Sequence, residues 1–552
     1  MVSGRSLFLS VLLLPAALLS QKAPVPPFHG QSLEEALKEA PAALESILEK
    51  DLRKHAFELA SKAYQGRLTG TPGQIKTAEY IAAHFRKLGL KPLRPLAAGK
   101  GGKKRGRPSF FQGYPITLNK VLEGSGLLDS KGRLLHRHGG WLSSDGEKVE
   151  TAGKLIFLGR GRRGDFEGQD LKGLIPVLDM TLPKKNRRMT VMRAMGEGFR
   201  LLGKLRGLAK RASENGARGL VVLYSKFPTS LANALNFVGI YPGKPRVSLE
   251  GKRRGGMSFM MRTKVPVLVL GDEDASEVLG VFGLEFETLR KDREEGKSSV
   301  GELSKGTYSF RFETEVEHSR ALNVCAYLPG RDPKLKKEAV VYSGHMDHLG
   351  MAPDGRIFFG ADDNGSGTSC ILEIAEAYAK LPKRLRPKRS ILFLIVSGEE
   401  LGLWGSAHFV EHPRWRLEDL VADINMDMVG RSTDKVPSDA IALTPTYRNR
   451  DFSTLAGETA WLGKAFGLRM TNGDRFYRRS DHYNFAKKGI PVVFFCDDEH
   501  ADYHMPTDTP DKLEFEKMVR VSRLSFLLGY RVANRAERPE RIGRSEGWFE
   551  GN

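Results

Sequence analysis

Five short polar segments between Val341 and Asp508 constrain the fold of this 552-residue chain more than any other feature. Each contains a carboxylate or an imidazole, and a short apolar run precedes four of them. The segments are residues 343–348, 360–367, 397–402, 425–430 and 502–508, and the runs are residues 339–342, 391–396, 420–424 and 491–495. Short apolar runs separated by helical patterns are typical of buried parallel strands.

Ligands of an open parallel sheet gather at the carboxyl ends of its strands. The polar segments stand at that end of each predicted strand, which a random scatter of His, Asp and Glu would not produce. Helices are expected between the strands at residues 366–381, 454–466 and 511–530, and two earlier helical regions at 32–64 and 74–88. We therefore predict a metal site on an α/β sheet.

The first twenty residues predict export. An apolar core at residues 7–19 follows Arg5 and is too short to span a bilayer comfortably, which indicates a secretory signal peptide cleaved near Ser20. No later stretch reaches the ~20 apolar residues of a membrane helix. We expect a secreted or periplasmic protein without a membrane span. The three cysteines, Cys325, Cys370 and Cys496, are isolated and form neither a disulfide framework nor a zinc knuckle.

Lys and Arg exceed Asp and Glu by 87 − 66 = 21. The excess is clustered at residues 100–107, 184–188, 252–254 and 383–389. These runs lack interleaved aromatic residues, and no nucleic-acid motif accompanies them, so we expect no nucleic-acid partner. A basic, well-solvated exterior explains them, and weak association with polyanionic surfaces is the alternative. Composition leaves the oligomeric state open.

The five segments resemble, in residue type and order, the co-catalytic di-zinc aminopeptidase family, which also includes glutamate carboxypeptidases and transferrin receptors (metallopeptidase family twenty-eight). The loop Gly66-Arg-Leu-Thr-Gly-Thr-Pro-Gly73 also fits this family. Residues 211–224 and 265–270 resemble a protease-associated domain, which the family commonly carries. The resemblance implies an α/β fold with a mixed, mostly parallel central sheet flanked by helices, as in zinc exopeptidases, and an inserted β-rich protease-associated domain.

The expected domain organisation follows from this resemblance and from the changes in composition along the chain. We predict a signal peptide at 1–20, a linker at 21–31, an N-terminal part of the peptidase domain at 32–134, the protease-associated-like insertion at 135–301, the main part of the peptidase domain at 302–533, and a disordered tail at 534–552.

The resemblance also implies two divalent metal ions, expected to be Zn²⁺. Their ligands would be His345, Asp363, Glu400, Asp427 and His504. Asp363 would bridge the two ions, with Asp362 as the alternative, and the family has a cis peptide bond after this residue. His348 is an alternative ligand to His345.

Three residues receive catalytic roles. The resemblance makes Glu399 the general base and lets Asp347 hold the ring of His345. Tyr503 would stabilise the oxyanion or pack beside the site. Residues expected to support the site or line its pocket are Asp362, Asn364, Ser480, Asp481 and His482. Otherwise His408, His412, His482 and His500 are predicted to be ordinary surface or capping histidines.

The predicted function is a metallo-aminopeptidase that removes N-terminal residues of peptide substrates. A carboxypeptidase or dipeptidase of the same family is an alternative, because Arg475, Arg478 and Arg479 could bind a terminal carboxylate. A non-catalytic, receptor-like binding protein is the other alternative. The complete ligand set argues against the latter.

Overall fold

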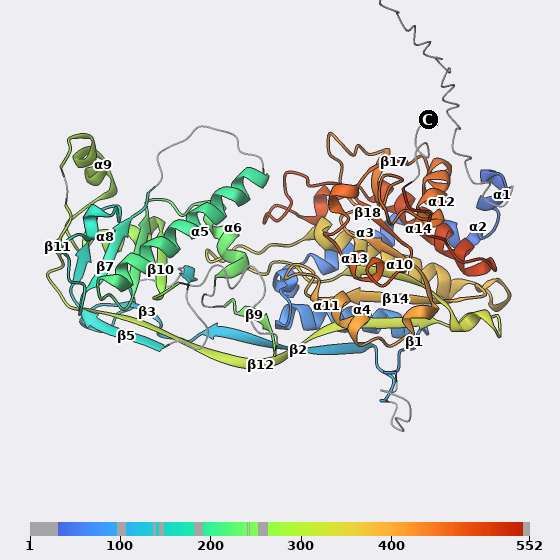
Figure 1. Ribbon diagram of the computed structural model, residues 1–552, viewed down its shortest axis with the longest axis horizontal. Coiled ribbons are helices and arrows are strands. Elements are labelled where there is room, and N and C mark those ends of the chain that lie inside the picture. The colour runs from blue at the N-terminus through green and yellow to red at the C-terminus, as the bar shows by residue number, and fades with distance from the viewer. Residues whose placement is uncertain are drawn as a thin grey trace, which may run out of the picture.

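The computed structural model describes residues 31–96, 106–135, 140–142, 148–181, 191–239, 241, 243–251, 263–297 and 299–544. The predicted signal peptide, the linker up to residue 30, the basic clusters at 184–188 and 252–254, most of the cluster at 100–107 and the last part of the tail lie outside these residues. No helix among the described residues combines the length and apolarity needed to cross a membrane. Figure 1 shows two bodies joined by the long strands β2 (Phe111–Val121) and β12 (Tyr308–Leu328).

The larger body is built on a mixed sheet, as predicted. Among the described residues this sheet has twelve strands, with the main order β17-β16-β18-β15-β13-β14-β12-β2-β9. Strands β18, β15, β13 and β14 in its centre run parallel to one another, whereas β12, β2 and β9 on one side pair antiparallel. The α/β fold is therefore confirmed, and the mostly parallel arrangement applies to the centre of the sheet.

The remaining elements of the larger body are named here by their bounds. The strands are β1 (Lys91–Pro92), β9 (Arg246–Leu249), β13 (Ala339–His345), β14 (Ser390–Val396), β15 (Leu420–Met426), β16 (Ala440–Thr444), β17 (Arg469–Asn472) and β18 (Val492–Cys496). The helices are α1 (Leu33–Leu37), α2 (Pro41–Glu45), α3 (Glu49–Leu59), α4 (Pro72–Lys87), α10 (Gly367–Lys380), α11 (Trp404–Glu411), α12 (Thr454–Gly463), α13 (His482–Ala486) and α14 (Phe515–Asn534).

The central strands are apolar throughout because helices cover both faces of the sheet. In β13, Val340 and Tyr342 join the core formed with α3, α4, α10 and α14, whereas Val341 packs with Phe409 of α11 and Phe485 of α13 on the other face. Alternate side chains of a strand point to opposite faces, so burial of both faces requires a continuous apolar run.

Helix boundaries differ from the predicted ones by a few residues, for local reasons. Helix α4 begins at Pro72, ahead of the predicted residue 74, because proline fits the first turn of a helix. Helix α14 begins at Phe515 because residues 510–512 form a separate 3₁₀ turn. Helix α12 ends at Gly463 and is followed by another 3₁₀ turn.

The smaller body has its own sheet, with the order β11-β6-β7-β8-β10-β4 among the described residues. Strands β6, β7, β8 and β10 are parallel, and helices pack against them. Its elements are β3 (Gly126–Leu128), β4 (Gly140–Leu142), β5 (Lys148–Gly153), β6 (Leu155–Phe157), β7 (Ile175–Asp179), α5 (Val191–Glu214), β8 (Leu220–Tyr224), α6 (Thr229–Val238), β10 (Val267–Gly271), α8 (Asp272–Gly280), α9 (Phe286–Glu294) and β11 (Glu302–Leu303).

Two strands pair with partners on both sides of the predicted division, or on the far side of it, between the peptidase domain and the insertion. The first part of β12 pairs with β5 and β3 of the smaller body, and its second part pairs with β2 and β14 of the larger sheet. Strand β9 leaves the predicted insertion and pairs with β2. The two bodies are thus connected by continuous strands, and the boundaries themselves stay a prediction.

The buried carboxyl of Glu373 on α10 makes stability depend on pH. Glu373 is 1% exposed, and its Oε1 lies 3.7 Å from Nε2 of His55 on α3. Burial, aided by the charges of Glu376 and Asp51, raises the pKa of Glu373 from 4.5 to about 8. Between these two values the unfolded chain releases the proton that the folded chain retains, so stability is lost as pH rises through this window.

We predict that Glu373→Gln removes this loss. The melting temperature of the variant minus that of the wild type should increase by several degrees from pH 5 to pH 8. Circular dichroism measures both melting temperatures. The exposed residue Glu79 provides a control, because Glu79→Gln should leave the pH dependence unchanged. A difference between Glu373→Gln and wild type that stays constant over this range would contradict the prediction.

Candidate metal centre

Four neighbouring strands bring the predicted ligands to one edge of the larger sheet. His345 is the last residue of β13, and Asp427 directly follows the end of β15. Glu400 lies in the turn after β14, and His504 in the loop after β18. Asp363 comes from the loop that precedes α10. Since these strands are parallel and adjacent, their carboxyl ends place all five side chains around one point.

The first group of ligand-type atoms surrounds His345. Its Nε2 lies 3.1 Å from Oδ1 of Asp427 and 3.4 Å from Oδ1 of Asp363. All three side chains are buried. The three atoms can therefore reach a common ion.

The second group surrounds Glu400. Nε2 of His504 lies 3.0 Å from Oδ2 of Asp363 and 3.1 Å from Oε2 of Glu400. Nδ1 of His348 lies 2.7 Å from Oε1 of Glu400, so each oxygen of this carboxylate faces its own imidazole. Because the two oxygens of Asp363 face different groups, this residue is shared between them.

Asp362 does not share this position. Its Oδ1 accepts a hydrogen bond of 2.8 Å from the Gly430 amide, and its Oδ2 lies 3.1 Å from Nε2 of His500. The peptide bond from Asp363 to Asn364 is cis, as the resemblance implies. The two oxygens of the Asp363 carboxylate, in contrast to those of Asp362, face His345 and His504. Of the two alternatives, the geometry therefore favours Asp363 as the shared residue.

The donor atoms fit two divalent cations. Nε2 of His345, Oδ1 of Asp427 and Oε1 of Glu400 are buried and make no hydrogen bond within the described part of the chain. The ligand atoms of His345, Asp363 and Asp427 lie within 4.8 Å of one another, as do those of His348, Asp363 and Glu400. Buried polar atoms normally have partners, and imidazole and carboxylate donors are those that zinc takes.

The charges in the centre perturb one another strongly. Burial opposes the charged form of His345, but the carboxylates of Asp427 and Glu399 raise its pKa well above the usual value. Burial raises the pKa of Glu399 well above its usual value, and the charge of His345 only partly offsets this effect. For Glu400, burial is outweighed by His504 and His348, and the pKa is lowered. Such mutual perturbation is typical of a functional site.

Asp347 lies behind His345 and is connected to Glu399. Nδ1 of His345 is 3.2 Å from the carbonyl oxygen and 3.8 Å from Oδ1 of Asp347. The same Oδ1 accepts a hydrogen bond of 3.3 Å from the Glu399 amide. The Glu399 carboxylate reaches into the cavity, with Oε2 4.0 Å from Nε2 of His345. The Glu399 carboxylate, the predicted general base, therefore faces the same space as the ligand atoms.

Tyr503 lies over the second group. Its ring stacks on His504 with the centroids 3.8 Å apart, and its hydroxyl accepts a hydrogen bond of 3.3 Å from Nη2 of Arg479. Arg479 in turn pairs with Glu499 at 2.6 Å. The phenol therefore combines packing with a polar contact at the cavity.

The predicted supporting residues lie mostly behind the cavity. The Asn364 side chain donates to the Met426 carbonyl at 2.9 Å and so fixes the Asp363 loop against β15. Ser480 accepts a hydrogen bond of 2.9 Å from Asn425, and Asp481 lies 2.5 Å from the Ser406 hydroxyl. His482 stacks on Phe494 with centroids 4.5 Å apart. Ser480, Asp481 and His482 are fully buried supports of the strands that carry the site.

Two histidines differ from the prediction. His482 and His500 were predicted to lie at the surface or at caps, and this is wrong, because both are buried. His482 fills an apolar space against Phe494, and His500 pairs with Asp362. Partners distant in sequence bury them, and local spacing carries no sign of such contacts. His408 is half-buried and His412 is exposed.

The cavity beside the ligands has an acidic side and an apolar side. Its lining consists of Asp363, Glu399, Asp427 and Glu499, of Met428, Phe476, Phe494 and Cys496, and of Arg479 and Tyr503. Burial would lower the pKa of Arg479, but Tyr503 and Glu499 raise it above its usual value, so its charge is neutralised by Glu499 within the cavity wall.

Two contacts from the smaller body were not predicted. Nζ of Lys244 donates to the carbonyl of Leu349 at 3.0 Å, and Nδ2 of Asn233 lies 3.0 Å from Sδ of Met505. Leu349 follows His348 directly, and Met505 follows His504. The contacts join segments far apart in sequence, and no local pattern could have indicated them.

Comparison with known proteins agrees with this geometry. Residues 323–528 match the model of peptidase family M28. Aminopeptidase YwaD of Bacillus subtilis is 23% identical over 97% of this chain and 94% of its own length. A probable leucine aminopeptidase of Arthroderma otae is 29% identical over 40% of this chain, which spans 60% of that relative. The structure of a zinc aminopeptidase from Bacillus subtilis superimposes with a TM-score of 0.50 and 20% identity, over 89% of this chain and 97% of that one, and shares its fold.

The shared position of Asp363 predicts unequal effects of ligand substitutions on metal content. Asp427→Ala should remove one of two bound ions, because Asp427 belongs to the first group alone, whereas Asp363→Ala should remove both. The measurement is metal per chain by mass spectrometry after dialysis. Asp354→Ala, in an exposed nearby turn, is the control and should keep the wild-type content. Equal losses in Asp427→Ala and Asp363→Ala would contradict a shared carboxylate.

Proposed function

We propose that this chain, a member of metallopeptidase family M28, is an exported aminopeptidase that uses two divalent cations and Glu399 as general base. One observation carries the proposal: two groups of buried imidazole and carboxylate donors share Asp363 and open onto the cavity that Glu399 enters. The similarity to aminopeptidases over nearly the whole chain supports the same activity.

The residues around the cavity provide the steps of peptide hydrolysis. When bound, the two cations would polarise the scissile carbonyl and lower the pKa of the attacking water. Glu399 takes a proton from this water as its oxygen bonds to the carbonyl carbon. The same carboxyl then gives the proton to the amine nitrogen as the C–N bond breaks. The contact of the Asp347 carboxylate with the Glu399 amide keeps the base beside His345.

Tyr503 is suited to stabilise the developing oxyanion. Its hydroxyl accepts a hydrogen bond from Arg479, which leaves the phenolic proton available for a substrate oxygen. The stacked His504 ring limits the positions that the phenol can adopt. Fixed donors aimed at a developing negative charge contribute strongly to catalysis.

The charges of the cavity favour the N-terminus of a peptide over its C-terminus. The carboxylates of Asp363, Glu399 and Asp427 line the cavity, and an α-ammonium group complements such acidic surroundings. A carboxypeptidase needs a cation free to bind the terminal carboxylate. Arg479 is paired with Glu499, and Arg475 with Asp498. This pairing counts against the carboxypeptidase alternative, as does the position of Arg478 outside the described lining of the cavity. The complete donor set counts against a receptor-like protein.

The apolar side of the cavity supports a preference for large apolar side chains at the cleaved residue. Met428, Phe476, Phe494 and Cys496 form one buried cluster beside the ligands, which Tyr503 extends. A charged side chain placed against this wall would lose hydration without gaining a partner.

Export is supported by the apolar core at residues 7–19 of the sequence. We propose cleavage near Ser20 and release into the periplasm or the medium. N-terminal sequencing of the mature protein isolated from its natural compartment tests this proposal.

The role of Glu399 predicts the outcome of an isosteric substitution. Glu399→Gln should lower kcat by about 10²- to 10⁴-fold, because the amide cannot accept the proton, while the metal content stays unchanged. Hydrolysis of an aminoacyl anilide and metal analysis measure the two effects. The exposed Glu411→Gln on the nearby helix α11 is a control expected to retain activity. Full activity in Glu399→Gln would rule out its assignment as the base.

The direction of cleavage predicts a pattern across a substrate panel. Leucyl and phenylalanyl anilides with a free amine should be hydrolysed, and glutamyl or lysyl analogues much more slowly. N-acetylated anilides and N-blocked dipeptides with a free carboxylate should not react. A chelator should abolish the activity, and added zinc should restore it. Faster cleavage of the N-blocked, C-terminally free peptides would instead establish the carboxypeptidase alternative.

A further inference from the structure

We propose that Arg67 and Thr69, in the loop Gly66–Gly73, are positioning residues that hold two ligand segments and the general base in register. The inference rests on the proposed function for its kinetic readout, whereas its metal-binding readout is independent of that function. Glycines and a proline distinguish this loop in the sequence. Arg67 and Thr69 are not among the described residues that line the cavity beside the ligands.

Arg67 joins the segments that carry two ligands, His345 and Asp363, through their main chains. Its guanidinium donates to the carbonyl oxygens of Met346 at 2.8 Å, Phe359 at 2.7 Å and Gly360 at 2.8 Å. Met346 lies between His345 and Asp347, and Gly360 lies three residues before Asp363. A fourth bond of 2.7 Å to Leu59 anchors the side chain to α3. One planar group thus fixes the distance between the end of β13 and the loop of the shared carboxylate.

The charge of Arg67 is also suited to this position. The side chain is 1% exposed, and no carboxylate of the described residues lies within ion-pair distance of it. Burial lowers its pKa to about 10, and the carboxylates of Asp363, Asp508, Asp347 and Glu400 oppose this shift. Arg67 is therefore a cation at neutral pH and reduces the repulsion among the acidic ligands.

Thr69 joins Asp347 to the segment of the general base. Its hydroxyl donates to Oδ2 of Asp347 at 2.9 Å and accepts a hydrogen bond of 3.0 Å from the Gly398 amide. Since Oδ1 of Asp347 receives the Glu399 amide, one hydroxyl and one carboxylate connect the loop, His345 and Glu399. Thr69 is completely buried, so water cannot replace these bonds.

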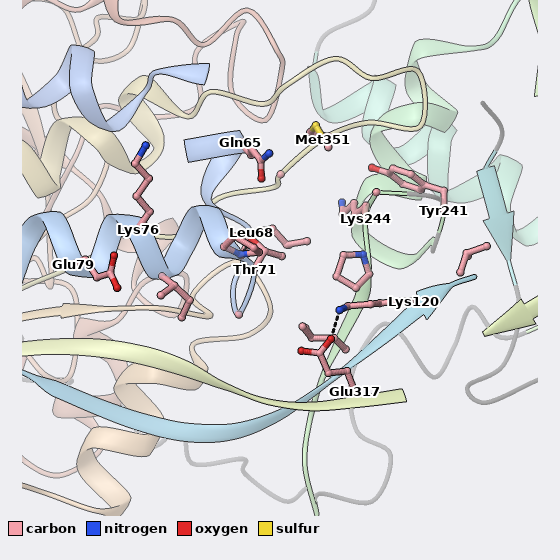
Figure 2. Close-up of a pocket in the computed structure, with 18 residues that line it drawn as sticks. Gln65, Leu68, Thr71, Lys76, Glu79, Lys120, Tyr241, Lys244, Glu317 and Met351 are labelled. Carbon is pink, nitrogen blue, oxygen red and sulfur yellow. Dashed lines mark hydrogen bonds and ion pairs between the residues drawn. The ribbon is translucent and has the colours of Figure 1, made fainter. Parts of the chain in front are cut away.

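The other side of the loop faces away from the metal centre. Gln65, Leu68 and Thr71 line a cavity of about 830 Å³ between α4, β2 and the segment around Tyr241 (Figure 2). The loop itself approaches the ligand segments closely. Gly66 has a φ of 68°, and a Cβ there would overlap the carbonyl oxygens of Gly350 and Phe358. The loop is therefore fixed to the ligand segments on the side that carries Arg67 and Thr69.

The first experiment compares Thr69→Val, Thr69→Ser and Thr71→Val in the full chain loaded with zinc. Valine has nearly the shape of threonine but cannot make either hydrogen bond, whereas serine keeps both. Thr71 lies in the same loop, and its hydroxyl bonds only the Leu68 carbonyl in the described structure, so Thr71→Val is a matched control. The readouts are kcat and KM on a leucyl anilide, and zinc affinity by competition with a chelating dye.

Thr69→Val should lose 10- to 100-fold in kcat or in zinc affinity, as partners of ligand-orienting groups do, with KM little changed. Thr69→Ser and Thr71→Val should stay within a few-fold of wild type. The proposal is overturned if Thr69→Val keeps both values, or if Thr71→Val or Thr69→Ser loses as much. Should the wild type cleave no peptide, the proposed function fails, but the zinc affinities still decide this inference.

The second experiment tests Arg67 by Arg67→Lys and Arg67→Met. Lysine keeps the charge but cannot span three carbonyl oxygens, and methionine keeps neither the charge nor the donors. Both variants should therefore bind zinc at least tenfold more weakly than the wild type, and Arg67→Met should bind it more weakly than Arg67→Lys. Circular dichroism identifies a variant that fails to fold, in which case Thr69→Val alone decides. Wild-type zinc affinity in a folded Arg67→Met chain would overturn the role of Arg67.

Discussion

Mutual repulsion among buried carboxylates is the constraint on which the rest of the structure depends. Asp363 shares the His345 imidazole with Asp427 and the His504 imidazole with Glu400, and all three carboxylates are largely removed from water. Like charges in a poorly solvated space raise the free energy unless opposite charge offsets them. The fold meets this cost by fixing Glu400 and Asp427 just after apolar strands and Asp363 in the buried loop before α10, so that the core, and not the site, determines their positions. Cations bound between the groups would supply the missing positive charge.

Behind the ligands, main-chain amides donate hydrogen bonds to the buried carboxylates of Asp362 and Asp508. Asp508 accepts hydrogen bonds of 3.1 Å from the amides of Asp362 and Asp363, and Asp362 accepts one from Gly430. Burial raises the pKa of Asp508 to about 7 despite these bonds. Amide donors stabilise a carboxylate without adding a competing side-chain ligand. The shared residue is thereby fixed through its backbone, and its carboxylate stays available to both groups.

The sequence allowed the central strands, and the sheet edge that carries the ligand-type residues, to be predicted, because both leave local signals, whereas the individual ligands came from the family resemblance. A short run such as Ile391–Val396 must be buried on both faces, and a polar residue after it must lie at the sheet edge. The contacts of Arg67 could not be predicted in this way, since its partners are carbonyl groups that every residue carries. The pairing of β9 with β2 joins segments more than a hundred residues apart, and neither strand shows it in its own pattern.

The two halves of the centre rest on different parts of the fold. His345 and Asp427 stand at the ends of adjacent hydrogen-bonded strands, so the sheet fixes two of the three members of the first group. His504 lies in a loop, and its neighbour Met505 contacts Asn233 of the smaller body, as Leu349 contacts Lys244. Figure 1 shows that the long strands β2 and β12 connect this body to the sheet. The contacts of Asn233 and Lys244 add a second connection between the two bodies, beside the second group. The second group therefore rests in part on a body that contributes none of its ligands.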